Sequence, residues 1–169
     1  MLGVTKRSDA YGDVGLVDRP EAKPAPGCVV LQTAGAGICG TDLHIFKNEY
    51  RAAPPVIMGH EVCGYVVEVG EGVDRALLGQ RFVAETFFST CGNCAYCRSG
   101  RTNLCLSRKS IGSHVDGAMA PRVCVPAINL HAPPSFMTDA AASLAEPLAC
   151  VTIRSLARPH MSNRAIGCW

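Results

Sequence analysis

The sequence predicts a mainly β fold, an irregular barrel or a sandwich with a small helical addition. Three observations indicate it: several short apolar runs rich in valine, glycine and proline between those runs, and little apolar periodicity at 3.6 residues. The chain has 169 residues, of which 48% are hydrophobic and 18% are charged. These values are typical of a globular domain with one core, and they exclude a chain that is disordered throughout.

Four segments are expected to form strands, because each is short, apolar and bounded by turn residues. The run at 28–33 lies between prolines and glycines, and the run at 61–69 is rich in valine and contains Gly64. The segments at 81–86 and 118–125 have the same character. A curved sheet is the arrangement that these runs favour.

One helix is expected at 139–144, where alanine predominates. Thr138 precedes it as a plausible N-cap, and Pro133 and Pro134 end the preceding segment. A second short helix is compatible with the pattern. From about residue 151 the apolar periodicity is lost, so we expect 154–169 to form a loosely held tail.

Charge and hydropathy exclude several classes of partner. The formal net charge is only +2 and no dense Lys/Arg run occurs, so nucleic acid is not expected as a partner. The longest uncharged stretch, 123–138, is broken by three prolines and is too short to span a membrane. The first 25 residues carry eight charged side chains, which does not fit a secretory signal, and we expect the protein in the cytoplasm.

Four of the ten cysteines fall within 15 residues: Cys91, Cys94, Cys97 and Cys105. Spacings of two, two and seven residues let one irregular loop wrap four thiolates around a single Zn²⁺. With four sulfur ligands no position stays open for a substrate, so this metal is expected to be structural. An iron–sulfur cluster is the alternative, but its bacterial motif places the fourth cysteine after three residues and follows it with proline. Four free thiols that only pack in the core are the other alternative.

Cys39, His60 and Glu61 form a second candidate group. A thiolate, an imidazole and a carboxylate brought together would make a three-ligand zinc site with one open position, as catalytic zinc requires. Taken one by one, such residues are more often a small core cysteine and a satisfied histidine.

In its ordered motifs the sequence resembles the zinc-containing medium-chain dehydrogenases. Gly-Ile-Cys-Gly-Thr-Asp-x-His at 37–44, Gly-His-Glu at 59–61 and the four-cysteine segment at 91–105 occur in the order found in that family. The segment 117–125 and Glu-Pro-Leu-Ala-Cys at 146–150 resemble its sorbitol and threonine dehydrogenase branch. The resemblance covers about residues 10–153.

The resemblance implies a GroES-like irregular β-barrel over residues 1–153, with the four-cysteine segment as a protruding zinc lobe. It implies two zinc ions, one structural and one catalytic, and the catalytic one acts as a Lewis acid on an alcohol or polyol. Cys39 and His60 match metal ligands, and the carboxylate ligand is Glu61 or Glu146. Thr41 and His44 match a proton relay. Asp42 would orient a ligand or form a local Asx turn.

The same resemblance implies NAD(P) on a second, doubly wound domain that begins with a glycine-rich turn. Residues 154–169 diverge from the family and are too few for a βαβ unit, so we expect this chain to lack the nucleotide-binding domain and to be inactive alone. Surface that would pack on that domain would then be exposed, and self-association into homo-oligomers would follow. The alternative function is a stand-alone zinc-binding module without catalysis.

Overall fold

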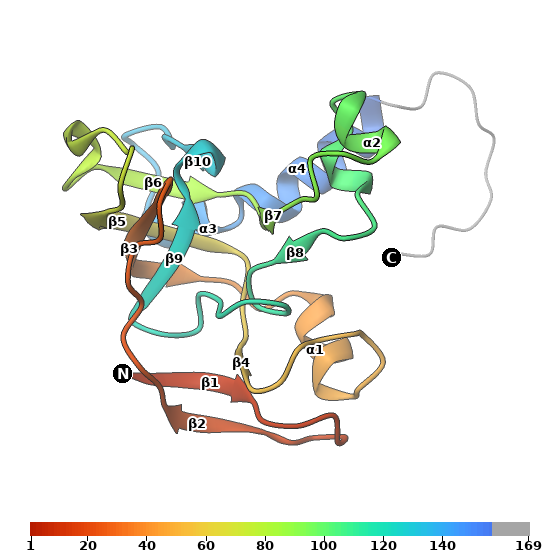
Figure 1. Ribbon diagram of the computed structural model, residues 1–169. Helices are drawn as coiled ribbons and strands as arrows, with labels where there is room; N and C mark the ends of the chain where they lie inside the picture. The colour runs from red at the N-terminus through yellow and green to blue at the C-terminus, as the bar shows by residue number, and fades with distance from the viewer. Residues whose placement is uncertain (157–169) are drawn as a thin grey trace.

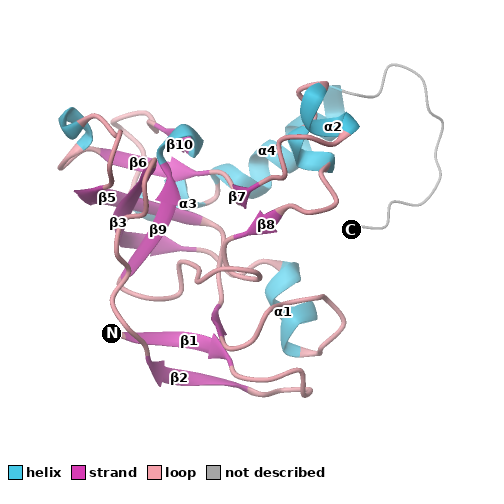
Figure 2. Ribbon diagram, in the orientation of Figure 1, coloured by secondary structure: helices cyan, strands magenta, loops and turns pink. Residues whose placement is uncertain are grey.

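A computed structural model describes residues 1–156 of the chain, with side chains for residues 1–152. The fold is mainly β, as the sequence predicts, and it is built around one curled sheet (Figure 2). The strands are β1 (Leu2–Lys6), β2 (Val14–Asp18), β3 (Cys28–Ala36), β4 (Val56–Ile57), β5 (Val62–Val69), β6 (Arg81–Ala84), β7 (Phe87–Ser89), β8 (Lys109–Ser110), β9 (Arg122–Pro126) and β10 (Leu130–His131). The helices are α1 (Gly40–Phe46), α2 (Ala95–Arg98), α3 (Asp139–Ser143) and α4 (Ala145–Leu156).

The main sheet has five antiparallel strands in the order β10-β6-β5-β3-β9. Strand β3 pairs with the central strand β5 on one side and with the edge strand β9 on the other (Figure 1). The β3–β5 register shifts twice. These irregularities curve the sheet around a core of valine, leucine and phenylalanine side chains. Val29, Leu31, Val62 and Val125 lie in this core with at most 1% of their surface exposed.

Two smaller sheets extend this barrel. Strand β1 pairs with β2 and β4 in a three-stranded sheet, and β7 pairs with β8 in a two-stranded sheet beside the four-cysteine segment. Figure 1 shows α1 between the three-stranded sheet and the two-stranded one, while α2 lies at the end of the molecule away from the barrel.

Strands were expected at 28–33, 61–69 and 81–86, and β3, β5 and β6 occupy these segments. The strand expected at 118–125 is shorter, because it begins only at Arg122. The residues before it serve another purpose, since the N–H groups of Ala118 and Met119 donate to the carbonyls of Gly59 and Met58.

The expected helix at 139–144 is α3, and the Thr138 side chain accepts from the N–H of Ala141 as an N-cap should. The structure contains more helix than the sequence indicates, because α4 continues through Leu156. The tail expected from residue 154 thus begins inside α4, and the rest of it lies outside the described residues. No helix in residues 1–156 is long and apolar enough to cross a membrane.

Candidate metal centres

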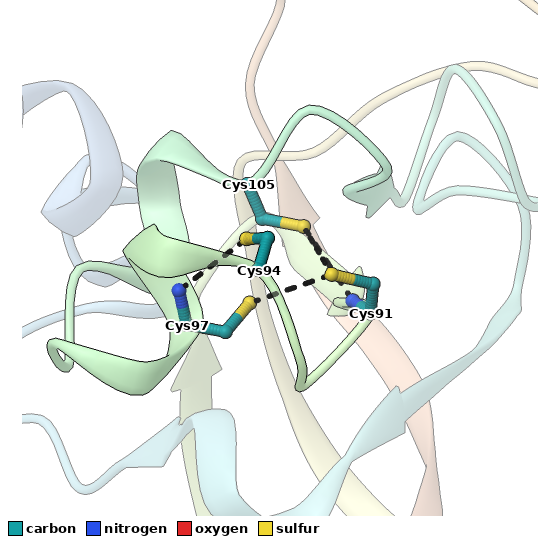
Figure 3. A group of neighbouring side chains, drawn as sticks. All are labelled: Cys91, Cys94, Cys97 and Cys105. Carbon is teal, nitrogen blue, oxygen red and sulfur yellow. Dashed lines mark hydrogen bonds between the residues drawn. The ribbon is translucent and has the colours of Figure 1, made fainter.

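The four predicted lobe cysteines converge on one point (Figure 3). Cys94 is the N-cap of α2, and its sulfur accepts a hydrogen bond from the N–H of Cys97 at 3.4 Å. The N–H of Cys91 donates to the sulfur of Cys105 at 3.4 Å. Backbone amides thus point at the sulfurs, as they do around negatively charged thiolates.

The sulfur positions fit a tetrahedral zinc site. All four sulfurs lie within 4.8 Å of one another, and the Sγ of Cys91 is 3.9 Å from that of Cys97 and 3.6 Å from that of Cys105. A tetrahedron with a Zn–S distance of about 2.3 Å places sulfurs about 3.8 Å apart. A disulfide requires about 2.0 Å, and all four cysteines are free thiols.

The pKa values of two lobe cysteines shift in opposite directions. The N–H groups of Asn93 and Cys94 lower the pKa of Cys91 to about 6. Desolvation, followed by hydrogen bonds with Cys94 and Cys105, raises the pKa of Cys97 to about 11. A bound Zn²⁺ would favour the thiolate form of all four, because a thiol that coordinates a metal is deprotonated.

Cys39, His60 and Glu61 also meet, with their candidate ligand atoms within 4.8 Å of one another. Cys39 directly precedes α1, whereas His60 and Glu61 occupy the link between β4 and β5. His60 and Glu61 are buried, at 8% and 4% exposed, and Cys39 is partly exposed. The group combines sulfur, nitrogen and oxygen donors at the edge of the interior, which suits zinc with an accessible side.

Asp42 connects the two halves of this group. Its buried carboxylate accepts from the N–H of Cys39 at 2.9 Å and from the N–H of Gly59 at 3.3 Å. It also lies 3.9 Å from Nδ1 of His60. Both roles considered for Asp42, a local turn and an orienting carboxylate, are compatible with these contacts.

Glycines hold the histidine segment in place. Gly59 has a φ of +92° and is packed against Gly112 and Gly117, where an added Cβ would overlap the Gly59 backbone. An added Cβ on Gly37 would likewise overlap the Glu61 carboxylate, and the N–H of Gly37 donates to the carbonyl of Glu61 at 3.0 Å. The close approach that brings the ligands together therefore depends on missing side chains.

Burial raises the pKa of Glu61 and the charge of Glu146 acts in the same direction, while His60 and Cys39 oppose the rise. Glu146, from the start of α4, stays outside the three-residue group but lies near it. The thiol of Cys150 donates to Glu146 at 3.5 Å, and burial raises the pKa of Cys150, with Glu146, Cys39 and Glu61 contributing. One turn of α4 therefore faces the group.

The two predicted relay residues lie on α1 next to Cys39. The thiol of Cys39 donates to Oγ1 of Thr41 at 3.6 Å, and Nδ1 of His44 lies 2.8 Å from Oε2 of Glu49. Thr41 and His44 are three residues apart on one helix, which places them on neighbouring positions of its surface.

Sequence reasoning missed three contributors to this site. Glu49 partners His44, Gly37 makes room for Glu61, and Cys150 lies beside Glu146. For Cys150 a signal was available, because it is one helical turn after Glu146. The motif at 37–44 includes Gly37 but does not show that it makes room for Glu61, and no local pattern identifies Glu49. The remaining histidines His114 and His131 lie outside both groups among the described residues, and His160 lies outside the described part.

Several known proteins are similar to this chain in sequence and fold. Residues 25–135 match the family model of the alcohol dehydrogenase GroES-like domain. The chain is 39% identical to sorbitol dehydrogenase of Halalkalibacterium halodurans, covering 89% of this chain and 44% of that protein. It is 41% identical to L-threonine 3-dehydrogenase of Pyrococcus abyssi, covering 94% and 46%.

A solved alcohol dehydrogenase from Escherichia coli CFT073 in complex with NADH has a similar fold, with a TM-score of 0.80 and 31% identity. The match covers 90% of this chain and 44% of that one. The chain thus spans less than half the length of the relatives it matches.

Proposed function

Because the chain belongs to the family of alcohol dehydrogenase GroES-like domains, we propose that it is the catalytic part of a zinc-dependent dehydrogenase. The reaction is oxidation of a small alcohol or polyol to a carbonyl compound, with the hydride passing to NAD(P) and the hydroxyl proton to water. The convergence of Cys39, His60 and Glu61 carries this proposal. Sorbitol and L-threonine, the substrates that two relatives are named for, are both small hydroxyl compounds.

The three-residue group is the proposed reaction centre. A zinc ion held there by Cys39, His60 and Glu61 would supply a Lewis acid that polarises the substrate oxygen. Glu146, in the first turn of α4 and close enough to act on the pKa of Glu61, is the carboxylate that would approach or replace Glu61. The four-cysteine lobe has no open position, so its proposed zinc is structural.

Thr41 and His44 are the proposed proton relay. The Thr41 hydroxyl, near Cys39, accepts the substrate proton as it gives its own proton to His44, whose exposed ring then releases a proton to solvent. Glu49 supports this role, because a hydrogen bond from Nδ1 to its carboxylate leaves Nε2 free to take a proton.

NAD(P) is assigned to a second domain of the doubly wound type. The named sheets of residues 1–156 are antiparallel and hold no βαβ unit, which is what cradles a dinucleotide pyrophosphate. A small cytoplasmic alcohol is the proposed substrate, and neither nucleic acid nor membrane takes part.

Cobalt substitution tests the metal chemistry in the chain itself. Two spectroscopically distinct sites are expected, a sulfur-only site and a mixed site that Cys39→Ala abolishes. Cys124→Ala removes a barrel thiol outside both groups and should leave both signals intact. A single site that depends only on Cys91 would contradict the proposal.

A chimera tests the reaction. Residues 1–151 would replace the aligned segment of the Halalkalibacterium sorbitol dehydrogenase, and NAD⁺ reduction would be followed with a panel of alcohols and polyols. Metal-dependent turnover that Cys39→Ala removes is the expected result. A folded chimera with both metals bound and no turnover would favour the zinc-binding module without catalysis.

A further inference from the structure

The part of the chain that contains the four-cysteine lobe is basic and has no acidic side chain. Residues 86–115 include four of the sixteen Lys and Arg residues of the chain and none of its fourteen Asp and Glu residues. The four cations are Arg98, Arg101, Arg108 and Lys109. Like charges repel one another, so this segment is stabilised when a negative charge lies among them.

Two arginines share an open groove of about 450 Å³ with a proposed zinc ligand. Arg51, from the loop after α1, and Arg108, three residues after Cys105, line this groove together with Cys105 and His114. Neither arginine forms an ion pair within the described part of the chain. Cations from two separate segments therefore lie on the same side of the lobe as one of its sulfurs.

Hydrogen bonds hold Arg108 beside Cys105. One Nη of its guanidinium donates to the carbonyl of Asn103 at 3.1 Å, and its backbone N–H donates to the carbonyl of Cys105 at 3.1 Å. The loop that carries Arg51 is attached to the same region, because the N–H of Ala53 donates to the carbonyl of Ser113 at 2.8 Å. Both guanidinium groups keep their charge at any ordinary pH.

The pKa of His114 shows that these cations converge. Burial lowers this pKa first, and the charges of Arg108, Arg51 and Lys109 lower it further. Cys105, which lines the same groove, is only 6% exposed and is the most buried of the lobe cysteines. Water screens charges least where they are buried, so this sulfur is the one on which nearby cations act most strongly.

A zinc ion held by four thiolates supplies the negative charge that the segment lacks. Zn²⁺ offsets only two of the four sulfur charges, so the filled lobe carries two net negative charges at its centre. We propose that Arg51 and Arg108 stabilise this charge, and that they thereby strengthen zinc binding in the lobe and slow zinc release. Neither arginine is a ligand, because both act through the thiolates. The inference rests on the lobe zinc of the proposed function and does not depend on the reaction.

Chelator competition tests this role in the full 169-residue chain. The chain carries Cys39→Ala, so that the zinc released to graded EDTA comes from the lobe, and both the affinity and the rate of release are measured. At low ionic strength, Arg51→Gln and Arg108→Gln should each weaken zinc binding at least threefold, and the double variant at least tenfold. Unchanged affinity and release rate in the double variant would overturn the proposal.

Lysine variants and salt separate charge from packing. Arg51→Lys and Arg108→Lys keep the positive charge and should retain zinc nearly as well as the parent. The defect of the glutamine variants should shrink in 1 M salt, where the Debye length is only about 3 Å. A defect that lysine does not rescue and that salt does not reduce would show a structural role and refute the electrostatic one.

Arg75→Gln is the matched control, because Arg75 is exposed and lies outside the groove. It should release zinc at the rate of the parent. Weakening equal to that of the groove variants would mean that only the net charge of the chain matters, and it would reject the local assignment.

The outcomes distinguish this inference from the proposed function. A parent chain that binds no zinc in the lobe would reject the lobe assignment and this inference with it. A filled lobe with equal zinc release in all variants would reject the inference alone. If the chimera is inactive while the glutamine variants release zinc faster, the reaction is wrong and the role of the arginines stands.

Discussion

Gly37 shows how one missing side chain shapes a metal site. The Glu61 carboxylate occupies the space that a Cβ at residue 37 would need, whereas a Cβ on Gly40, three residues along, would meet nothing within 4 Å. Of these two glycines, only Gly37 is needed to leave room for a proposed metal ligand.

We predict that Gly37→Ala displaces Glu61 and weakens metal binding at the Cys39 group at least tenfold, while the lobe zinc stays bound. Gly40→Ala is the matched control and should bind both metals normally. Zinc content after dialysis against graded chelator measures both sites. Two normal sites in Gly37→Ala would show that the carboxylate is not needed.

At the residue scale the sequence identifies the candidate ligands but not what assembles them. Cys39, His60 and Glu61 could be chosen through the family resemblance, because spacing alone leaves three ordinary residues. Their convergence depends on the packing of Gly59 against Gly117, which lies 58 residues later in the chain. It also depends on the buried Asp42 carboxylate, which accepts from the N–H of Gly59. Such contacts leave no periodic trace in the sequence.

Among the elements, the four-cysteine lobe is held differently from the barrel. None of the residues between Cys91 and Cys105 belongs to either hydrophobic cluster of the described chain, and α2 is a single turn. A segment without apolar packing of its own needs another source of stability. Zinc binding supplies on the order of 10 kcal/mol in small zinc-binding peptides.

Replacing Cys97 by serine is therefore expected to remove one equivalent of zinc and to unfold the lobe while the barrel persists. Limited proteolysis between residues 95 and 104, with elemental analysis, would detect both effects. Cys124→Ser, in strand β9, is the comparison and should keep two zinc ions and full resistance. Full zinc content and protease resistance in Cys97→Ser would rule out the lobe assignment.

Strands of the main sheet were predictable because β3, β5 and β6 bury continuous apolar runs. The strands β1 and β2 were not predictable. The buried side chains of β1 include the polar Thr5 and Lys6, so its sequence lacks an apolar run. Lys6 is satisfied through its Nζ, which donates to the carbonyl of Ala10 at 2.5 Å. Helix α4 was not assigned, because apolar periodicity is lost from about residue 151. Pro147 lies in its first turn, where proline is tolerated.

At the scale of the whole molecule, the lowered pKa of His114 predicts that the free energy of unfolding depends on pH. Burial and the nearby arginines lower its pKa below the ordinary value of 6.5, so the unfolded chain binds more protons in the window just below 6.5. Stability therefore rises with pH through that window and is lost as pH falls.

We expect the free energy of unfolding, measured with urea, to decline from pH 7 to pH 5.5 less steeply in His114→Gln than in the parent chain. At pH 8 both chains lack the extra proton, so any remaining difference there reflects packing and serves as the baseline. Parallel pH profiles would show that His114 is not responsible.

The pairing of β3 with β9 affects the order in which parts of the chain fold. Cys28 is paired with Pro126, so the sheet closes a loop of nearly 100 residues, whereas the four cysteines span 91–105. Loop-closure entropy and high contact order make the long closure slow, and the short one needs little chain diffusion. We therefore expect the cysteine segment to capture a zinc ion before the barrel closes, and metal supply during synthesis to affect the folding yield.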